Sequence, residues 1–134
     1  KRLPITGTGE ETRGFTYVED IVKGLMLLGH HDQAVGEAFN LAADREITIK
    51  YLAEAVNKIT GNRAGIEFRN RRKWDDHNRR FASNNKAKEV LDFSPTIEFE
   101  QGIENTVKWF KDNWDFVNKL SYFPRGMSSS VRKE

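Results

Sequence analysis

The sequence contains no cysteine and no long apolar stretch. Without cysteine the chain cannot form a disulfide framework or a thiolate metal site, and this composition fits a reducing compartment, so we expect a cytoplasmic protein. No apolar run approaches the ~18 residues that a membrane-spanning helix needs. The sequence therefore gives no support to a disulfide-stabilised secreted domain or to a membrane protein.

Histidine is scarce, with 3 residues in the whole chain. His30 and His31 are adjacent, so their side chains point apart on a strand or loop, and the next histidine is His77. A protein metal site needs several ligands that converge on one point. We therefore predict no metal site.

Neither sign of charge dominates. The 22 basic and 20 acidic side chains give a formal net charge of +2, so the field of the whole molecule gives little reason to expect nucleic acid or membrane as a partner. A chain of 134 residues fits one domain with a single core. Because it begins with Lys1 and no signal-like segment follows, we expect a piece of a longer protein.

A glycine-rich nucleotide loop is also missing. Gly7 and Gly9 lack a third glycine at the required offset, no G-K-[ST] follows, and the segment leads into a predicted strand rather than a helix. These two residues are better interpreted as turn glycines.

Residues 12–28 read TRGFTYVEDIVKGLMLL and combine a strand pattern with a helix pattern. The alternation of Arg13, Phe15 and Tyr17 predicts a strand up to residue 18. Apolar residues at helical spacing then predict a helix that begins near Glu19 and ends at Gly29. An arginine on such a strand can fork onto a phosphate or carboxylate, although a surface ion pair is the alternative.

Short strands and helices alternate along the rest of the chain, which predicts an α/β fold. Strands are expected near Ile5, at 39–41 and at 66–68, and further helices near Thr48, Ser83 and Phe99. Thr48 is a plausible N-cap. Asn40 lies in the apolar segment EAFNLAA, where its amide can satisfy the backbone or contact a ligand.

Residues 69–80, RNRRKWDDHNRR, form the most basic stretch. A basic run around Trp74 can bind single-stranded nucleic acid, but Asp75 and Asp76 interrupt it. A solvated loop with internal ion pairs is a second interpretation. The third is an arginine clamp for a diphosphate.

Three blocks of the sequence, between Ile5 and about Phe110, resemble one known family in the same order. The blocks are G-T-G-E-E-T-R-G-F-T-Y-V-E-D, then Arg72-Lys73-Trp74-Asp75 with Ser83-Asn84-Asn85-Lys86-Ala87, and then Glu100-Gln101-Gly102-Ile103 with Thr106-Val107-Lys108-Trp109-Phe110. They resemble the C-terminal, substrate-binding region of the extended short-chain dehydrogenase/reductase family, which comprises NAD-dependent nucleotide-sugar epimerases, dehydratases and decarboxylases. The family usually has aspartate in place of Ser83, and either side chain can cap a helix.

The resemblance implies a substrate-binding role for five residues. Arg13 and Arg72 would converge on the diphosphate of a nucleoside diphosphate sugar. Asp75 would orient Arg72 or accept from a hydroxyl of the ligand. Thr48 and Asn40 are weaker candidates beside their structural roles.

The catalytic groups implied by the resemblance are absent from the sequence. The family uses NAD, a Rossmann domain and a Y-x-x-x-K pair, but no tyrosine here is followed by lysine at that spacing. We therefore predict that residues 1–120 form a substrate-binding domain, with a flexible tail at 121–134. We expect it to be inactive without an N-terminal Rossmann domain of the same enzyme that binds NAD, and the resemblance allows for a homodimer of that enzyme. The alternative is a stand-alone interaction module whose basic stretch binds an acidic or nucleic-acid partner.

Overall fold

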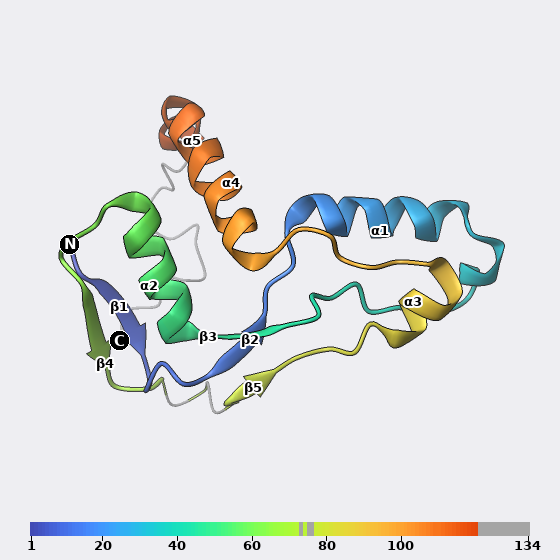
Figure 1. The fold of residues 1–134 in the computed structure, drawn as a ribbon, viewed down its shortest axis with the longest axis horizontal. Coiled ribbons are helices and arrows are strands. Elements are labelled where there is room, and N and C mark those ends of the chain that lie inside the picture. The colour runs from blue at the N-terminus through green and yellow to red at the C-terminus, as the bar shows by residue number, and fades with distance from the viewer. Residues whose placement is uncertain (73, 75–76, 121–134) are drawn as a thin grey trace.

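The computed structural model describes residues 1–72, 74 and 77–120. These residues form an elongated α/β fold, with α1 and α3 at one end and β1, β4 and α2 at the other (Figure 1). The elements, in chain order, are β1 (Leu3–Thr6), β2 (Thr12–Gly14), α1 (Val18–His30), the 3-10 turn η1 (Asp32–Ala34), β3 (Glu46–Thr48), α2 (Ile49–Thr60), β4 (Ile66–Arg69), β5 (Arg79–Arg80), α3 (Asn85–Leu91), α4 (Phe99–Asp112) and α5 (Trp114–Leu120). The predicted α/β class is confirmed.

The strands form two small sheets. β1 and β4 pair in parallel, with Leu3 opposite Ile66 and Thr6 opposite Arg69. In the second sheet β2 is central, antiparallel to β3 and parallel to β5. The strands predicted at Ile5 and 66–68 are therefore confirmed, whereas β3 and β5 were not predicted.

The strand predicted over residues 13–18 is too long, because β2 ends at Gly14. Beyond Gly14 the chain leaves the sheet, and the ring of Phe15 packs against Phe99 with centroids 5.7 Å apart. The carbonyl of Tyr17 then accepts from the amides of Asp20 and Ile21 and begins α1.

The strand predicted at 39–41 is wrong for this chain, since no ladder pairs that segment in the described residues. Side chains hold it instead. The Asn40 amide donates to the Ser83 carbonyl at 3.1 Å, and the Asn84 amide donates to the Ala42 carbonyl at 3.1 Å.

Helix α2 follows the prediction closely. Thr48 is its N-cap, and the Thr48 hydroxyl accepts from the Tyr51 amide at 3.1 Å. Gly61 ends the helix with φ +70°, a left-handed conformation that glycine adopts without a steric cost.

The main apolar cluster lies where α1 and α3 meet. Its buried members are Ala87, Leu91 and Phe93. Gly24 lets α1 approach closely, because a Cβ at this position would lie 2.7 Å from a methyl carbon of Leu41. The cluster thus depends on a residue without a side chain in α1.

Asp20 fixes the first turn of α1 to the segment before α4. Its carboxylate is fully buried and accepts from the Thr96 hydroxyl at 2.9 Å and the Ile97 amide at 3.0 Å. Burial alone would raise the pKa of Asp20, but these hydrogen bonds and the charge of Lys23 lower it below its usual value.

A second contact joins α2 to α4. Glu100 accepts from the Tyr51 hydroxyl and from Arg45, both at 2.7 Å. Those hydrogen bonds, together with one from its own backbone, lower the pKa of Glu100 to about 2. The pair is half-exposed, so solvent screening keeps its contribution to stability small.

The long helix predicted from Phe99 is interrupted at Asn113. Both the backbone amide and the side-chain amide of Asn113 donate to the carbonyl of Trp109. An asparagine that bonds locally in this way competes with continued helix. The tail predicted at 121–134 lies outside the described residues.

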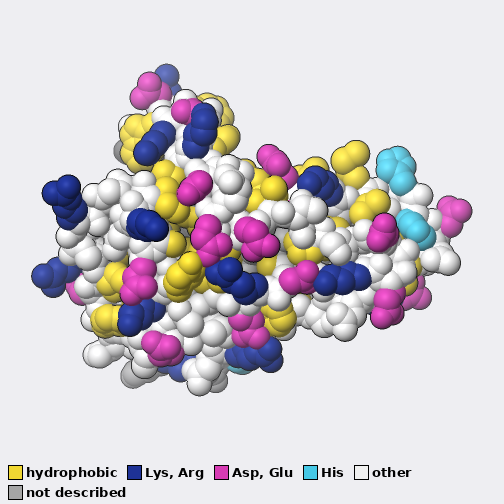
Figure 2. Space-filling model, in the orientation of Figure 1, with side chains coloured by type: hydrophobic (Ala, Val, Ile, Leu, Met, Phe, Trp, Pro, Cys, Tyr) yellow, Lys and Arg dark blue, Asp and Glu magenta, His cyan; other side chains and the backbone are white. Residues whose placement is uncertain are grey.

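Hydrophobic side chains are unusually exposed along α1 and over α4 and α5 (Figure 2). On α1 these are Val18, Val22, Leu25, Met26 and Leu27. None of the helices in the described ranges is long and apolar enough to cross a bilayer.

Candidate functional site

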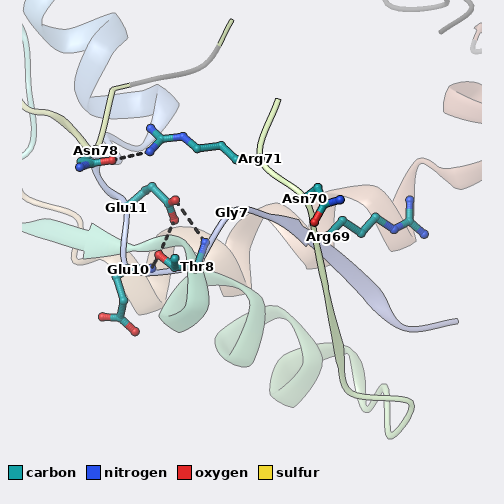
Figure 3. A pocket seen from close by; sticks show the side chains of 8 residues that line it. All are labelled: Gly7, Thr8, Glu10, Glu11, Arg69, Asn70, Arg71 and Asn78. Carbon is teal, nitrogen blue, oxygen red and sulfur yellow. Dashed lines mark hydrogen bonds between the residues drawn. The ribbon is translucent and has the colours of Figure 1, made fainter. Parts of the chain in front are cut away.

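A cavity of about 530 Å³ lies at the carboxyl ends of the parallel strands β1 and β4 (Figure 3). The residues that line it are Gly7, Thr8, Glu10, Glu11, Arg69, Asn70, Arg71 and Asn78. They come from the last residue of β4, from the segments that directly follow β1 and β4, and from the residue before β5. Ligands commonly bind where parallel strands end, because the loops there converge.

Glu11 forms one wall of the cavity and is held by backbone groups. Its buried carboxylate accepts from the amide of Gly9 at 2.8 Å and from the amide of Thr8 at 3.2 Å. Burial would raise the pKa of Glu11, but the backbone hydrogen bonds and the charge of Arg71 lower it. Glu11 is therefore an ionised acceptor with a fixed position.

Two arginines meet at Asn78, which lies beside Glu11 in Figure 3. Arg71 donates to the Asn78 side-chain oxygen at 2.7 Å, and its side chain extends toward that residue in Figure 3. Arg13, on β2, donates to the backbone carbonyls of His77 at 3.1 Å and Asn78 at 3.4 Å. The guanidinium of Arg13 thus lies behind the cavity wall and fixes its backbone.

Arg72 directly follows Arg71 but does not line the cavity. Its guanidinium carbon lies 5.2 Å from the ring centroid of Trp74, within cation–π range. Asp75, the residue expected to orient Arg72, lies outside the described residues. The convergence of Arg13 and Arg72 on one anion stays a prediction.

The two weaker candidates have structural partners. Thr48 caps α2, and Asn40 binds the Ser83 carbonyl. Ligand contacts by either residue stay predictions.

The cavity is lined by donors and acceptors of both charge signs. Arginines and side-chain amides can donate to phosphate or carbonyl oxygens, whereas Glu11 can accept from N–H or hydroxyl groups. Arg69 and Glu10 point away from the other side chains in Figure 3. Among the described residues no group of three potential metal ligands lies together. This arrangement suits a polar organic ligand that offers both hydrogen-bond acceptors and donors.

The sequence did not identify Glu11, Arg71 or Asn78 as part of a cavity. Glu11 stands in a turn predicted only from its glycines, and Arg71 is one of several arginines in the basic stretch. The parallel pairing of β1 with β4, about sixty positions apart, brings these residues together.

Comparison with known proteins assigns the family. The family model described as GDP-mannose 4,6 dehydratase matches residues 1–106, which is most of the chain. The chain belongs to the GDP-mannose 4,6 dehydratase family. It corresponds to part of the extended short-chain dehydrogenase/reductase enzymes that act as nucleotide-sugar epimerases and dehydratases, as the sequence blocks predicted.

Members of this family with known activities resemble the chain over nearly all of its length. UDP-glucuronic acid decarboxylase 1 of Xenopus tropicalis is 30% identical over 133 residues, which is 99% of this chain and 31% of that protein. The UDP-glucuronate 4-epimerase of Thermodesulfobacterium geofontis is 32% identical over 125 residues, 90% of this chain and 36% of its own length. The chain therefore spans about a third of the length of these relatives.

A solved structure also resembles this chain, in agreement with the family assignment. Epimerase Mth375 from Methanothermobacter thermautotrophicus superposes with a TM-score of 0.86 and 44% identity, covering 89% of this chain and 35% of the other. The sequence match and the structural match therefore agree over most of the chain.

Proposed function

We propose that this chain is the substrate-binding part of an NAD-dependent nucleotide-sugar epimerase, dehydratase or decarboxylase. In this role it holds a nucleoside diphosphate sugar at a site beside the cavity at the ends of β1 and β4. Arg13 and Arg72 balance the charge of the diphosphate, each through paired hydrogen bonds. Asp75 orients Arg72 or accepts from a hydroxyl of the ligand, and Thr48 and Asn40 lie near the ligand.

One observation carries the proposal. Two arginines from distant segments, Arg13 and Arg71, both donate hydrogen bonds to Asn78, which lines the cavity at the carboxyl ends of two parallel strands. The family motif places Arg72 directly after Arg71. Neighbouring guanidinium groups can donate paired hydrogen bonds to phosphate oxygens.

In this proposal the nicotinamide cofactor binds outside this chain. In the described residues the turn at Gly7 and Gly9 joins β1 to β2, so it cannot open a helix beneath a dinucleotide. The residues present do not fit NAD. We assign NAD to an N-terminal Rossmann domain of the same enzyme, and the relatives, about three times as long as the matched segment, leave room for one.

Binding to the 134-residue chain tests the proposal. UDP-glucuronic acid and UDP-glucose are suitable probes because family members act on such sugars, and UDP and a single-stranded oligonucleotide are the comparisons. We expect a thermal shift with the UDP-sugars and UDP, and little with the oligonucleotide.

A strongly salt-dependent shift with the oligonucleotide alone would instead support the interaction-module alternative. The structure weakens that alternative, because Arg69 is paired with Glu67 and Arg79 with Glu46. No shift with any nucleotide would contradict the substrate-binding role.

A further inference from the structure

The carboxylate of Glu46 on β3 joins all three strands of the second sheet. It accepts from the Thr12 hydroxyl on β2 at 2.7 Å and from Arg79 on β5, at 2.8 Å and 3.0 Å from Arg79 Nε and also from Arg79 Nη2. We propose that Glu46 is a positioning residue of the ligand site, which holds β5 and the backbone of His77 and Asn78 against Arg13. The consequence for ligand affinity rests on the function proposed above.

The Glu46–Arg79 pair differs from a surface ion pair in its geometry. The Glu46 side chain is only 24% exposed, and the carboxylate meets donors from two neighbouring strands. The Arg79 side chain is itself 68% exposed, but its guanidinium carbon also lies 5.7 Å from the ring centroid of Phe81. Arg79 is therefore held by both Glu46 and Phe81.

Phe81 completes the attachment of β5 to β2. A Cβ on Gly14 would lie 3.2 Å from the Phe81 ring, so the ring rests against the backbone of β2. The segment from Arg79 to Phe81 is thus attached at both ends, through Arg79 to Glu46 and through Phe81 to Gly14.

The backbone ladder transmits this attachment to Arg13. Thr12 pairs with Arg79 and Arg13 with Arg80, and the Thr12 amide donates to the Asn78 carbonyl at 2.8 Å. Arg13 donates hydrogen bonds to the carbonyls of His77 and Asn78. These two residues come immediately before Arg79 in the sequence. A two-residue strand has few ladder bonds of its own, so side-chain contacts decide whether it stays in place.

Hydrogen exchange at the Thr12 amide tests the positioning directly and needs no ligand. We expect Glu46→Gln and Arg79→Gln each to speed this exchange about threefold to tenfold, the factor for losing one partly exposed hydrogen-bonded pair. The double variant should be no faster than Glu46→Gln alone, because the Arg79 contact is already lost in that variant. Glu37→Gln removes the exposed Lys86 pair on another part of the surface and should leave Thr12 unchanged.

Affinity for UDP-glucuronic acid tests the consequence for the site. Glu46→Gln should weaken binding about threefold to tenfold in the normal chain and not at all in an Arg13→Ala background, since Glu46 acts through Arg13. A residue that merely stabilises the fold would weaken binding equally in both backgrounds.

The outcomes separate this inference from the proposed function. Unchanged Thr12 exchange in both Glu46→Gln and Arg79→Gln would overturn the positioning role. Faster exchange with full affinity for UDP-glucuronic acid would overturn its link to the ligand. If the unmodified chain binds no nucleotide, the proposed function fails, while the exchange result still decides whether Glu46 positions β5.

Discussion

At the residue scale, Asp20 is the most buried charged side chain in the described part of the chain. Replacing it with asparagine would remove a charged acceptor from the Ile97 amide and the Thr96 hydroxyl. We expect Asp20→Asn to lower the free energy of unfolding by ~1.5–3 kcal/mol at pH 7, measured by denaturant unfolding. The exposed neighbour Glu19 provides the control, since Glu19→Gln should change stability little.

The same residue predicts a pH dependence. The folded pKa of Asp20 lies below its unfolded value of about 3.9, so its stabilisation is complete above that value and is lost as pH falls through the folded pKa. The difference in stability between the unmodified chain and Asp20→Asn should therefore shrink below about pH 4. A difference that stays constant to pH 2 would contradict this account.

Arg71 and Arg72 are adjacent but have different surroundings, and binding measurements can separate their roles. Arg71 is engaged with Asn78 and lowers the pKa of Glu11. Arg72 is the arginine of the R-x-x-D motif of the resembled family. We expect Arg72→Ala to weaken UDP-sugar binding by ~1.5–3 kcal/mol and Arg71→Ala by much less, measured by calorimetry. Equal losses would indicate a diffuse basic patch.

At the element scale, α1 depends on the absence of a side chain at one position. A Cβ at Gly24 would meet Leu41 methyl carbons at 2.7 Å and 2.8 Å and the Phe93 ring at 3.0 Å. Overpacking should therefore outweigh the gain in helix propensity, and Gly24→Ala should destabilise by ~1–3 kcal/mol in denaturant unfolding.

Gly29 in the same helix is a matched control. No atom lies within 4 Å of a Cβ built there, so Gly29→Ala should be neutral or stabilising by up to ~1 kcal/mol. Similar destabilisation by both substitutions would mean that packing at Gly24 is not the cause.

The elements that could be predicted are those specified by their own local residues. Thr48 and Gly61 mark both ends of α2 through a cap and a left-handed turn. β5 could not be predicted, because Arg79 and Arg80 carry no strand pattern and Arg79 is held by Glu46, which is more than thirty positions away in the sequence. Segment 39–41 forms no strand with the described residues, where Asn40 and Asn84 supply side-chain contacts instead. In the resembled family this segment pairs with the sheet of the N-terminal Rossmann domain, and that pairing stays a prediction.

The same limit applies to the candidate site. Arg13 could be singled out because it stands alone on a patterned strand. Glu11 and Asn78 could not, because their approach depends on the pairing of β1 with β4 and of β2 with β5. The family blocks drew attention to Arg72, whose neighbour Arg71 lines the cavity.

At the scale of the whole molecule, the exposed apolar stripe on α1 should cause self-association. Val22, Leu25 and Met26 are 49%, 57% and 61% exposed and lie within one turn of the helix, so they form a contiguous apolar surface. We expect the double substitution Leu25→Glu and Met26→Lys to lower the association seen in sedimentation while leaving the thermal midpoint nearly unchanged. Unaltered association would point to the exposed side chains of α4 and α5.

The most direct test of the account is reconstitution of activity. The 134-residue chain would be mixed with a separately expressed Rossmann domain of a family member, NAD and UDP-glucuronic acid, and products followed by chromatography. The account predicts turnover only in the complete mixture, and much less when the chain carries Arg72→Ala. Turnover by the chain without the Rossmann domain would contradict it.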